Sequence, residues 1–193
     1  MYYYSGGDTL NYFYSAEVMT RLLFVNFRTF VDILFTGDLN PTNLSAFTID
    51  TGTPYYKFDF NTFLVVRLAT PLVLLTFRSY MAASLLIATL SYTGIWKAYT
   101  VFVEQFPKLE KQMALAFLFL PSVFFWGSGI LKDTITLSAV GWFTYSIYRI
   151  LKGKILSPRY VIYILISSYL LLSIKPYLFY ALVPSSSLLA LMI

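Results

Sequence analysis

Nine carboxylates are the main candidates for acid–base chemistry, because the sequence contains neither histidine nor cysteine. Without histidine, the commonest general base and the commonest metal ligand are missing. Without cysteine there is no thiolate nucleophile, zinc–thiolate site or disulfide. Proton transfer or metal binding would therefore use a carboxylate, a lysine or a tyrosine. The carboxylates are Asp8, Glu17, Asp32, Asp38, Asp50, Asp59, Glu104, Glu110 and Asp133.

The composition predicts an integral membrane protein. Of the 193 residues, 58% are hydrophobic and 12% are charged, whereas soluble domains carry about 25% charged residues. The charge is also uneven: residues 1–59 have a net charge of −3 and residues 60–193 a net charge of +8. In so hydrophobic a chain, a basic excess indicates membrane topology rather than nucleic-acid binding, so we expect no nucleic-acid partner.

The elements that must position these carboxylates are predicted to be helices. Residues 9–35 have aromatic and aliphatic side chains at helical spacing, which favours one or two short amphipathic helices along a membrane interface. Residues 60–77 are apolar but contain Arg67 and Pro71. We expect spanning helices at about 79–103, 113–131, 134–148, 160–174 and 177–193. The predicted fold class is all-α: a polytopic transmembrane helical bundle over 79–193, with an outer-face loop and amphipathic juxtamembrane helices over 1–78.

Topology decides which acids can share a site. The basic tract Arg149, Lys152, Lys154 and Arg159 is expected on the cytoplasmic side. Alternating spans then place Asp133 at the outer face, and a solvated loop with Glu104, Glu110 and Lys111 at the cytoplasmic face. An arginine in mid-span costs about 2.5–3.5 kcal/mol on insertion scales. We therefore expect 60–77 to lie in the interface, which puts the acidic N-terminal segment on the same face as Asp133.

Three groups of short motifs follow one another along the chain. They are Gly7-Asp8-Thr9-Leu10-Asn11-Tyr12 with Ala16 and Glu17 behind it, then Arg67-Leu68, then Pro121, Ser122, Trp126-Gly127-Ser128-Gly129 and Lys132-Asp133. In this order they resemble the N-terminal half of a GT-C superfamily glycosyltransferase. The first group resembles the acidic outer loop of the family, the second the arginine of its juxtamembrane stretch, and the third the later span that ends before an aspartate. The family's first span is missing before Asp8, and the chain ends in an apolar run, so we expect a fragment or a reduced relative.

The resemblance implies an enzyme of a bacterial cytoplasmic membrane that moves a sugar from a polyprenyl-phosphate carrier to an acceptor at the outer face. Its partners would be membrane lipid and the polyprenyl-phosphate-linked sugar, while any cofactor or metal stays unassigned. The resemblance implies Asp8 as the catalytic carboxylate, Asp133 as a supporting acid, and Tyr12, Arg67 and Lys132 as substrate-binding residues, the two cations for the carrier phosphate.

Each of these residues also has a structural interpretation. Asp8 fits a solvated turn after Gly6-Gly7, and Asp133 fits the first turn of a helix, where an acid is stabilised by the helix dipole. Lys132 and Arg78 fit snorkelling to headgroups, whereas Arg67 needs a partner because its neighbours are apolar. Lys175, before Pro176, is a similar case. The tyrosines at 2–4, 12 and 14 suit an interfacial belt, and the stretch 126–129 suits either unwound backbone or a helix-packing face.

Two other functional classes therefore remain open. One is a polysaccharide polymerase or ligase. The other is a non-catalytic membrane subunit or transporter fragment, in which Arg67, Lys132, Asp133 and Lys175 only pair within the bundle or anchor its ends.

Overall fold

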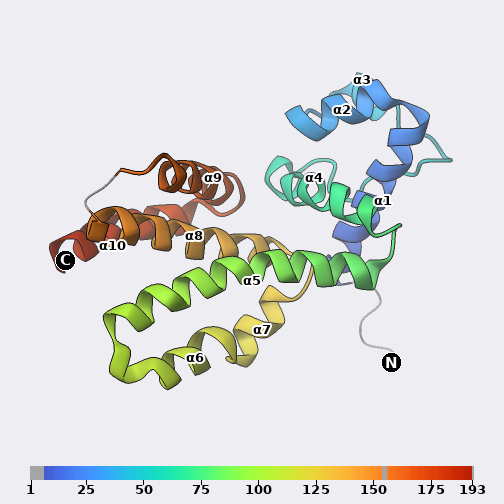
Figure 1. Ribbon diagram of the computed structural model, residues 1–193. Coiled ribbons are helices and arrows are strands. Elements are labelled where there is room, and N and C mark those ends of the chain that lie inside the picture. Colours follow the sequence, from blue (N-terminus) through green and yellow to red (C-terminus); the bar gives the residue numbers. More distant parts are fainter. Residues whose placement is uncertain (1–6, 154–155, 193) are drawn as a thin grey trace. The chain divides into compact units, whose positions relative to one another are not determined.

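The described part of the chain, residues 7–153 and 156–192 of a computed structural model, contains helices and no strands, which confirms the all-α prediction (Figure 1). Apolar residues recur at helical spacing through most of the chain, and prolines open or end several helices. The elements are α1 (Asp8–Val25), α2 (Phe27–Thr36), α3 (Pro41–Leu44), α4 (Phe60–Leu75), α5 (Tyr80–Gln105), the 3₁₀ helix η1 (Pro107–Leu109), α6 (Glu110–Leu118), α7 (Pro121–Gly127), α8 (Lys132–Gly153), α9 (Pro158–Ile174) and α10 (Pro176–Met192).

The helices form two compact units, which are described separately. Unit 1 takes the described residues up to Ile87 together with Gly129–Lys132. Unit 2 takes Ala88–Ser128 and the described residues from Asp133 onward. The boundary falls within α5, whereas the sequence predicts a division between residues 78 and 79.

Helix α4 is the core helix of unit 1 and packs along α1. Met19 and Leu22 of α1 and Phe63 and Val66 of α4 are completely buried. The residues from Thr62 to Arg67 are all buried, whereas Leu68, Leu74 and Leu75 in the second half of α4 are exposed. The first half of this segment is therefore covered by unit 1, and its expected place in a membrane interface stays a prediction.

No single described helix is both long and apolar enough to cross a bilayer, although two bent pairs of helices meet that requirement together. One pair is α4 with α5, bent by 118°. The bend uses Phe77 and Arg78, whose φ angles of 52° and 62° lie in the left-handed region that non-glycine residues seldom adopt. The other pair is η1 and α6 with α7, bent by 45°.

The second bend corrects the prediction of one helix over 113–131. Helix α6 ends at Leu118 and α7 begins at Pro121. Proline lacks a backbone N–H and its ring clashes with the preceding turn, so it ends one helix and suits the first position of the next. Helix α8 is longer than predicted: the sequence pattern ends it at residue 148, and in the structure it continues to Gly153.

In unit 2, α5 and α8 lie side by side and run in the same direction, with α6 and α7 returning between their ends (Figure 1). Gly94 of α5 meets Ser138 and Gly141 of α8, where an added Cβ would collide with backbone. Ser91 Oγ also donates a hydrogen bond of 2.5 Å to the carbonyl oxygen of Thr134. Small residues let two helix backbones approach this closely.

Helices α9 and α10 pack against each other at the end of the chain. Lys175 and Pro176 separate them, as the sequence predicts for the segments 160–174 and 177–193. The proline again supplies the physical reason, since the residue before it is disfavoured in the α conformation.

Candidate functional site

Asp8 is the first residue of α1 and its side chain is exposed. A carboxylate in this position is stabilised by the positive end of the helix dipole. Its Oδ1 atom accepts a hydrogen bond of 3.3 Å from the phenol of Tyr56. One oxygen of Asp8 is therefore held by a donor, while the carboxylate stays open to solvent.

Two tyrosines, Tyr12 and Tyr56, lie beside Asp8. Tyr12, one turn further along α1, is 3% exposed and stacks on Tyr56 with ring centroids 4.6 Å apart. Burial raises the pKa of Tyr12 well above its usual range, and Tyr56 and the carboxylates of Asp8 and Asp59 raise it further. Burial, with the charge of Asp8, raises the pKa of Tyr56 to about 12. Both phenols therefore stay protonated and can only be hydrogen-bond donors toward a carboxylate.

Asp59 and Lys132 complete the cluster. Asp59 is the N-cap of α4 and accepts hydrogen bonds from the amides of Asn61 and Thr62, at 3.1 and 3.2 Å, and from the Thr62 hydroxyl. The Thr62 hydroxyl, the Thr62 amide and Lys132 lower the pKa of Asp59 below its usual value. The Nζ atom of Lys132 lies 3.6 Å from Oδ2 of Asp59.

The segment 129–132 reaches this cluster because it packs on the first turn of α1. A Cβ at Gly129 would lie 2.9 Å from the Thr9 methyl carbon, so the glycine permits this close approach. Ile130 is 1% exposed. The Tyr80 hydroxyl also donates a hydrogen bond of 3.1 Å to the Thr9 hydroxyl. Lys132 and Asp8 therefore belong to one region of unit 1.

This unit 1 cluster (Asp8, Tyr12, Tyr56, Asp59 and Lys132) contains three of the residues that the sequence analysis selects. Tyr56 and Asp59 were not selected. For Asp59 a signal exists, since an aspartate directly before the apolar run of residues 60–77 is a typical N-cap. Nothing local singles out Tyr56, because its partners Asp8 and Tyr12 lie far away in the chain.

Arg67 has a structural role in this structure. Its side chain is buried, 8% exposed, and its Nε donates a hydrogen bond of 2.7 Å to the carbonyl oxygen of Leu34. Its Nη2 donates to the carbonyl oxygen of Phe35. Both carbonyls belong to the last turn of α2, where a cation is favoured by the helix dipole. These two carbonyl oxygens thus supply the hydrogen-bond partners that a buried guanidinium among apolar residues needs.

Asp133 belongs to unit 2 and lies in the first turn of α8, where the sequence predicts it. Its Oδ1 accepts a hydrogen bond from Nζ of Lys175, the residue between α9 and α10. Asp8 and Asp133 thus belong to different units, and their joint action in one centre stays a prediction.

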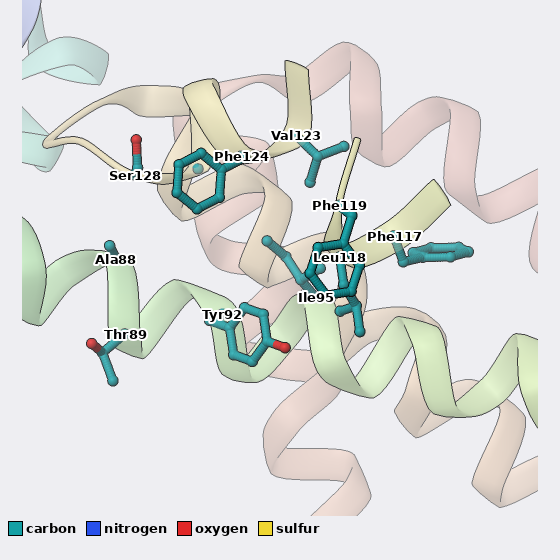
Figure 2. A pocket seen from close by; sticks show the side chains of 11 residues that line it. Ala88, Thr89, Tyr92, Ile95, Phe117, Leu118, Phe119, Val123, Phe124 and Ser128 are labelled. Carbon is teal, nitrogen blue, oxygen red and sulfur yellow. The ribbon is translucent and has the colours of Figure 1, made fainter. Parts of the chain in front are cut away.

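Unit 2 also contains an apolar cavity of about 390 Å³ between α5 and the consecutive helices α6 and α7 (Figure 2). Tyr92 and Ile95 line it from α5, and Phe119, Val123 and Phe124 line it from the other side. Among the described residues, no charged side chain lines this cavity, so their arrangement suits an apolar group and supplies no acid or base.

A metal site of the usual kind is not found: within residues 7–153 and 156–192, no three histidine, cysteine or acidic residues lie close enough to hold one ion. Comparisons of the chain with models of protein families, with curated proteins and with solved structures find no match. The function is therefore argued from the chemistry of the residues.

Proposed function

We propose that this chain is a membrane-embedded glycosyltransferase that takes a sugar from a polyprenyl-phosphate carrier, with Asp8 as its general base. The observation that carries the proposal is the unit 1 cluster, in which the exposed carboxylate of Asp8 accepts a hydrogen bond from a protonated tyrosine and Lys132 pairs with the second carboxylate, Asp59. The resemblance to the GT-C superfamily supplies the substrate class.

The chemistry assigns one task to each group. Asp8 accepts the proton of an acceptor hydroxyl while that oxygen bonds to the anomeric carbon of the sugar. The bond between this carbon and the carrier phosphate breaks, and its electron pair leaves with the phosphate. Lys132 supplies positive charge for the departing phosphate, and Asp59 holds the lysine in place. Tyr56 keeps one oxygen of Asp8 bound, so that the other faces the acceptor.

Three features support a membrane location. The composition is apolar, and the interface of α5 and α8 uses glycine and serine, as helix pairs in bilayers do. The chain direction also agrees with alternate crossings, because Glu104 at the end of α5 meets Arg149 and Lys152 at the end of α8. By the positive-inside rule, this basic end would face the cytoplasm.

The test is sugar transfer by membranes that contain the full chain, supplied with polyprenyl-phosphate hexoses and assayed for release of polyprenyl phosphate. Asp8→Asn should lower the rate by about 100-fold or more, the range of general base catalysis. Asp50→Asn is the matched control, because Asp50 is an exposed carboxylate in the same segment and outside the cluster. Equal rates for the two variants would contradict the proposal.

The non-catalytic membrane subunit is the second candidate, because two pairings favour it. Arg67 binds the end of α2, and Asp133 binds Lys175, so both have structural partners. In that class, Asp8→Asn and Lys132→Gln would leave any transfer activity of the host membranes unchanged, and Arg67→Met would reduce the amount of folded chain.

A further inference from the structure

An aromatic and basic cluster lies toward the C-terminal ends of α5 and α8, within unit 2. It consists of Lys97 from α5 with Trp142, Tyr145, Arg149 and Lys152 from α8. The Nζ atom of Lys97 lies 4.7 Å from the ring centroid of Tyr145 and 5.6 Å from that of Trp142. The guanidinium carbon of Arg149 lies 5.1 Å from the same Tyr145 ring. Two cations thus converge on one aromatic side chain.

Lys97 has no carboxylate partner in the part of the chain that the structure describes. The carboxylate of this region is Glu104, and it is already shared. Its Oε1 lies 2.5 Å from Nη2 of Arg149, and its Oε2 lies 3.1 Å from Nζ of Lys152. The Tyr148 hydroxyl donates to Oε2 as well, at 3.4 Å. Glu104 thus faces the α8 cations and leaves Lys97 with aromatic contacts.

Arg149 keeps one donor unused. Its Nε atom is buried and has no hydrogen-bond partner among the described residues. A buried N–H without an acceptor carries a desolvation penalty, so a native structure usually supplies one. Lys97, Arg149 and Lys152 with the one carboxylate of Glu104 therefore leave a net positive charge in this cluster.

We propose that this cluster binds the phosphate of an anionic membrane lipid, with Lys97 and Arg149 as its cationic contacts. A phosphate supplies the missing negative charge and oxygen acceptors for both a lysine and a guanidinium. Basic sites between helices at the cytoplasmic side of a membrane bind anionic headgroups for this reason. The proposal rests on the membrane location proposed above and is independent of the sugar-transfer activity.

The surroundings favour a lipid over free phosphate. The Trp142 ring lies 4.7 Å from the Tyr163 ring, and the Tyr145 ring lies 6.1 Å from the Tyr160 ring, so aromatic side chains of α9 continue the cluster. Tryptophan and tyrosine gather at headgroup depth in membrane proteins. A headgroup phosphate held here would keep its acyl chains against an apolar, aromatic surface.

The test measures retention of radiolabelled phosphatidylglycerol by the purified, detergent-solubilised full chain, with phosphatidylcholine and inorganic phosphate as competitors. Lys97→Met, which keeps the length of the side chain, should lower retention about fivefold, the contribution of one basic residue near an anionic headgroup. Lys97→Arg should retain the lipid. Glu104→Gln should raise retention, because it releases Arg149 and Lys152 from their carboxylate. Lys111→Gln is the matched control, an exposed lysine of α6 outside the cluster.

Competition by unlabelled phosphatidylglycerol alone, with the two opposite effects of Lys97→Met and Glu104→Gln, would support the proposal. Equal retention in the wild type and Lys97→Met would overturn it, as would equal competition by phosphatidylcholine. Competition by inorganic phosphate at the same concentration would assign the site to the free ion and overturn the lipid as its occupant. Thermal unfolding of each variant without lipid separates loss of the site from loss of the fold.

Discussion

The Nζ atom of Lys132 lies 3.6 Å from Oδ2 of Asp59, and this pair connects the start of α8 to the start of α4. Asp59 has a second role as the cap of α4, so one carboxylate orders a helix end and holds the lysine near Asp8 and Tyr12. The candidate site thus depends on a residue that touches no substrate in the proposed reaction. The effect of substituting Asp59 on the stability of the fold can be measured separately from its effect on sugar transfer.

Replacing Asp59 with alanine should lower the free energy of unfolding by about 1 kcal/mol, the usual cost of losing an N-cap. The effect should depend on pH, because the pKa of Asp59 is lower in the folded chain than its ordinary value. The stabilisation is complete above the unfolded pKa of about 3.9 and is lost as the pH falls through the lower pKa of the folded chain. Thermal midpoints of the wild type and Asp59→Ala in detergent should therefore converge in acid. Asp50→Ala is the control, and a difference that grows in acid would contradict the assignment.

Substitutions at Gly37 and at Arg67 should have coupled effects on the free energy of unfolding. Gly37 ends α2 with a φ of 73°, and a Cβ there would lie 2.5 Å from Nη1 of Arg67. Gly37→Ala should therefore strain the backbone and displace the guanidinium, which lowers the free energy of unfolding by about 1–3 kcal/mol. Arg67→Met should cost a similar amount by leaving the carbonyls of Leu34 and Phe35 without their donor. A double variant that costs less than the sum of the two, measured by thermal unfolding, would confirm the coupling. Arg67→Met with unchanged stability and reduced transfer would instead favour a phosphate-binding role.

The crossing of α5 and α8 should not tolerate a larger residue. A Cβ at Gly94 or Gly141 would collide with the backbone of the other helix. Gly94→Ala and Gly141→Ala should each lower the stability by about 1–3 kcal/mol, the cost of overpacking. Gly153→Ala is the matched control, because a Cβ added at Gly153 would meet no atom of another described residue within 4 Å. Equal thermal midpoints for all three variants would contradict the close crossing.

The sequence located most helices because apolar spacing and proline positions are local signals. Helices α5, α9 and α10 lie where the apolar segments predict them. The interfacial position of 60–77 stays a prediction, because an apolar pattern does not distinguish the core of a protein from lipid: α4 packs along α1, and Arg67 binds α2. The prediction of one helix over 113–131 underestimated Pro121, which starts a new helix.

The candidate site was only partly predictable, because its partners are distant in the chain. Asp8, Tyr12 and Lys132 could be selected from motifs, but the pairing of Lys132 with Asp59 needs the path of 129–132 past Thr9. Glu104 was expected in a solvated loop, yet it lies in the last turn of α5 and binds Arg149 and Lys152. Glu104 meets these two cations because α5 and α8 run in parallel. No local pattern in the sequence predicts this arrangement of the two helices.

The pair of Asp133 and Lys175 is expected to stabilise unit 2 as an ion pair. Asp133 accepts the hydrogen bond of Lys175 at the junction of α9 and α10, and both side chains are partly exposed. Asp133→Asn and Lys175→Met should each reduce the thermal midpoint of the purified chain, and the double variant should cost less than their sum by about 0.5 kcal/mol or more. Additive effects would show that the two residues act separately. Transfer activity in Asp133→Asn gives the second readout: a loss of transfer at unchanged thermal midpoint would favour the supporting acid that the resemblance implies, and parallel losses of both would favour the structural role.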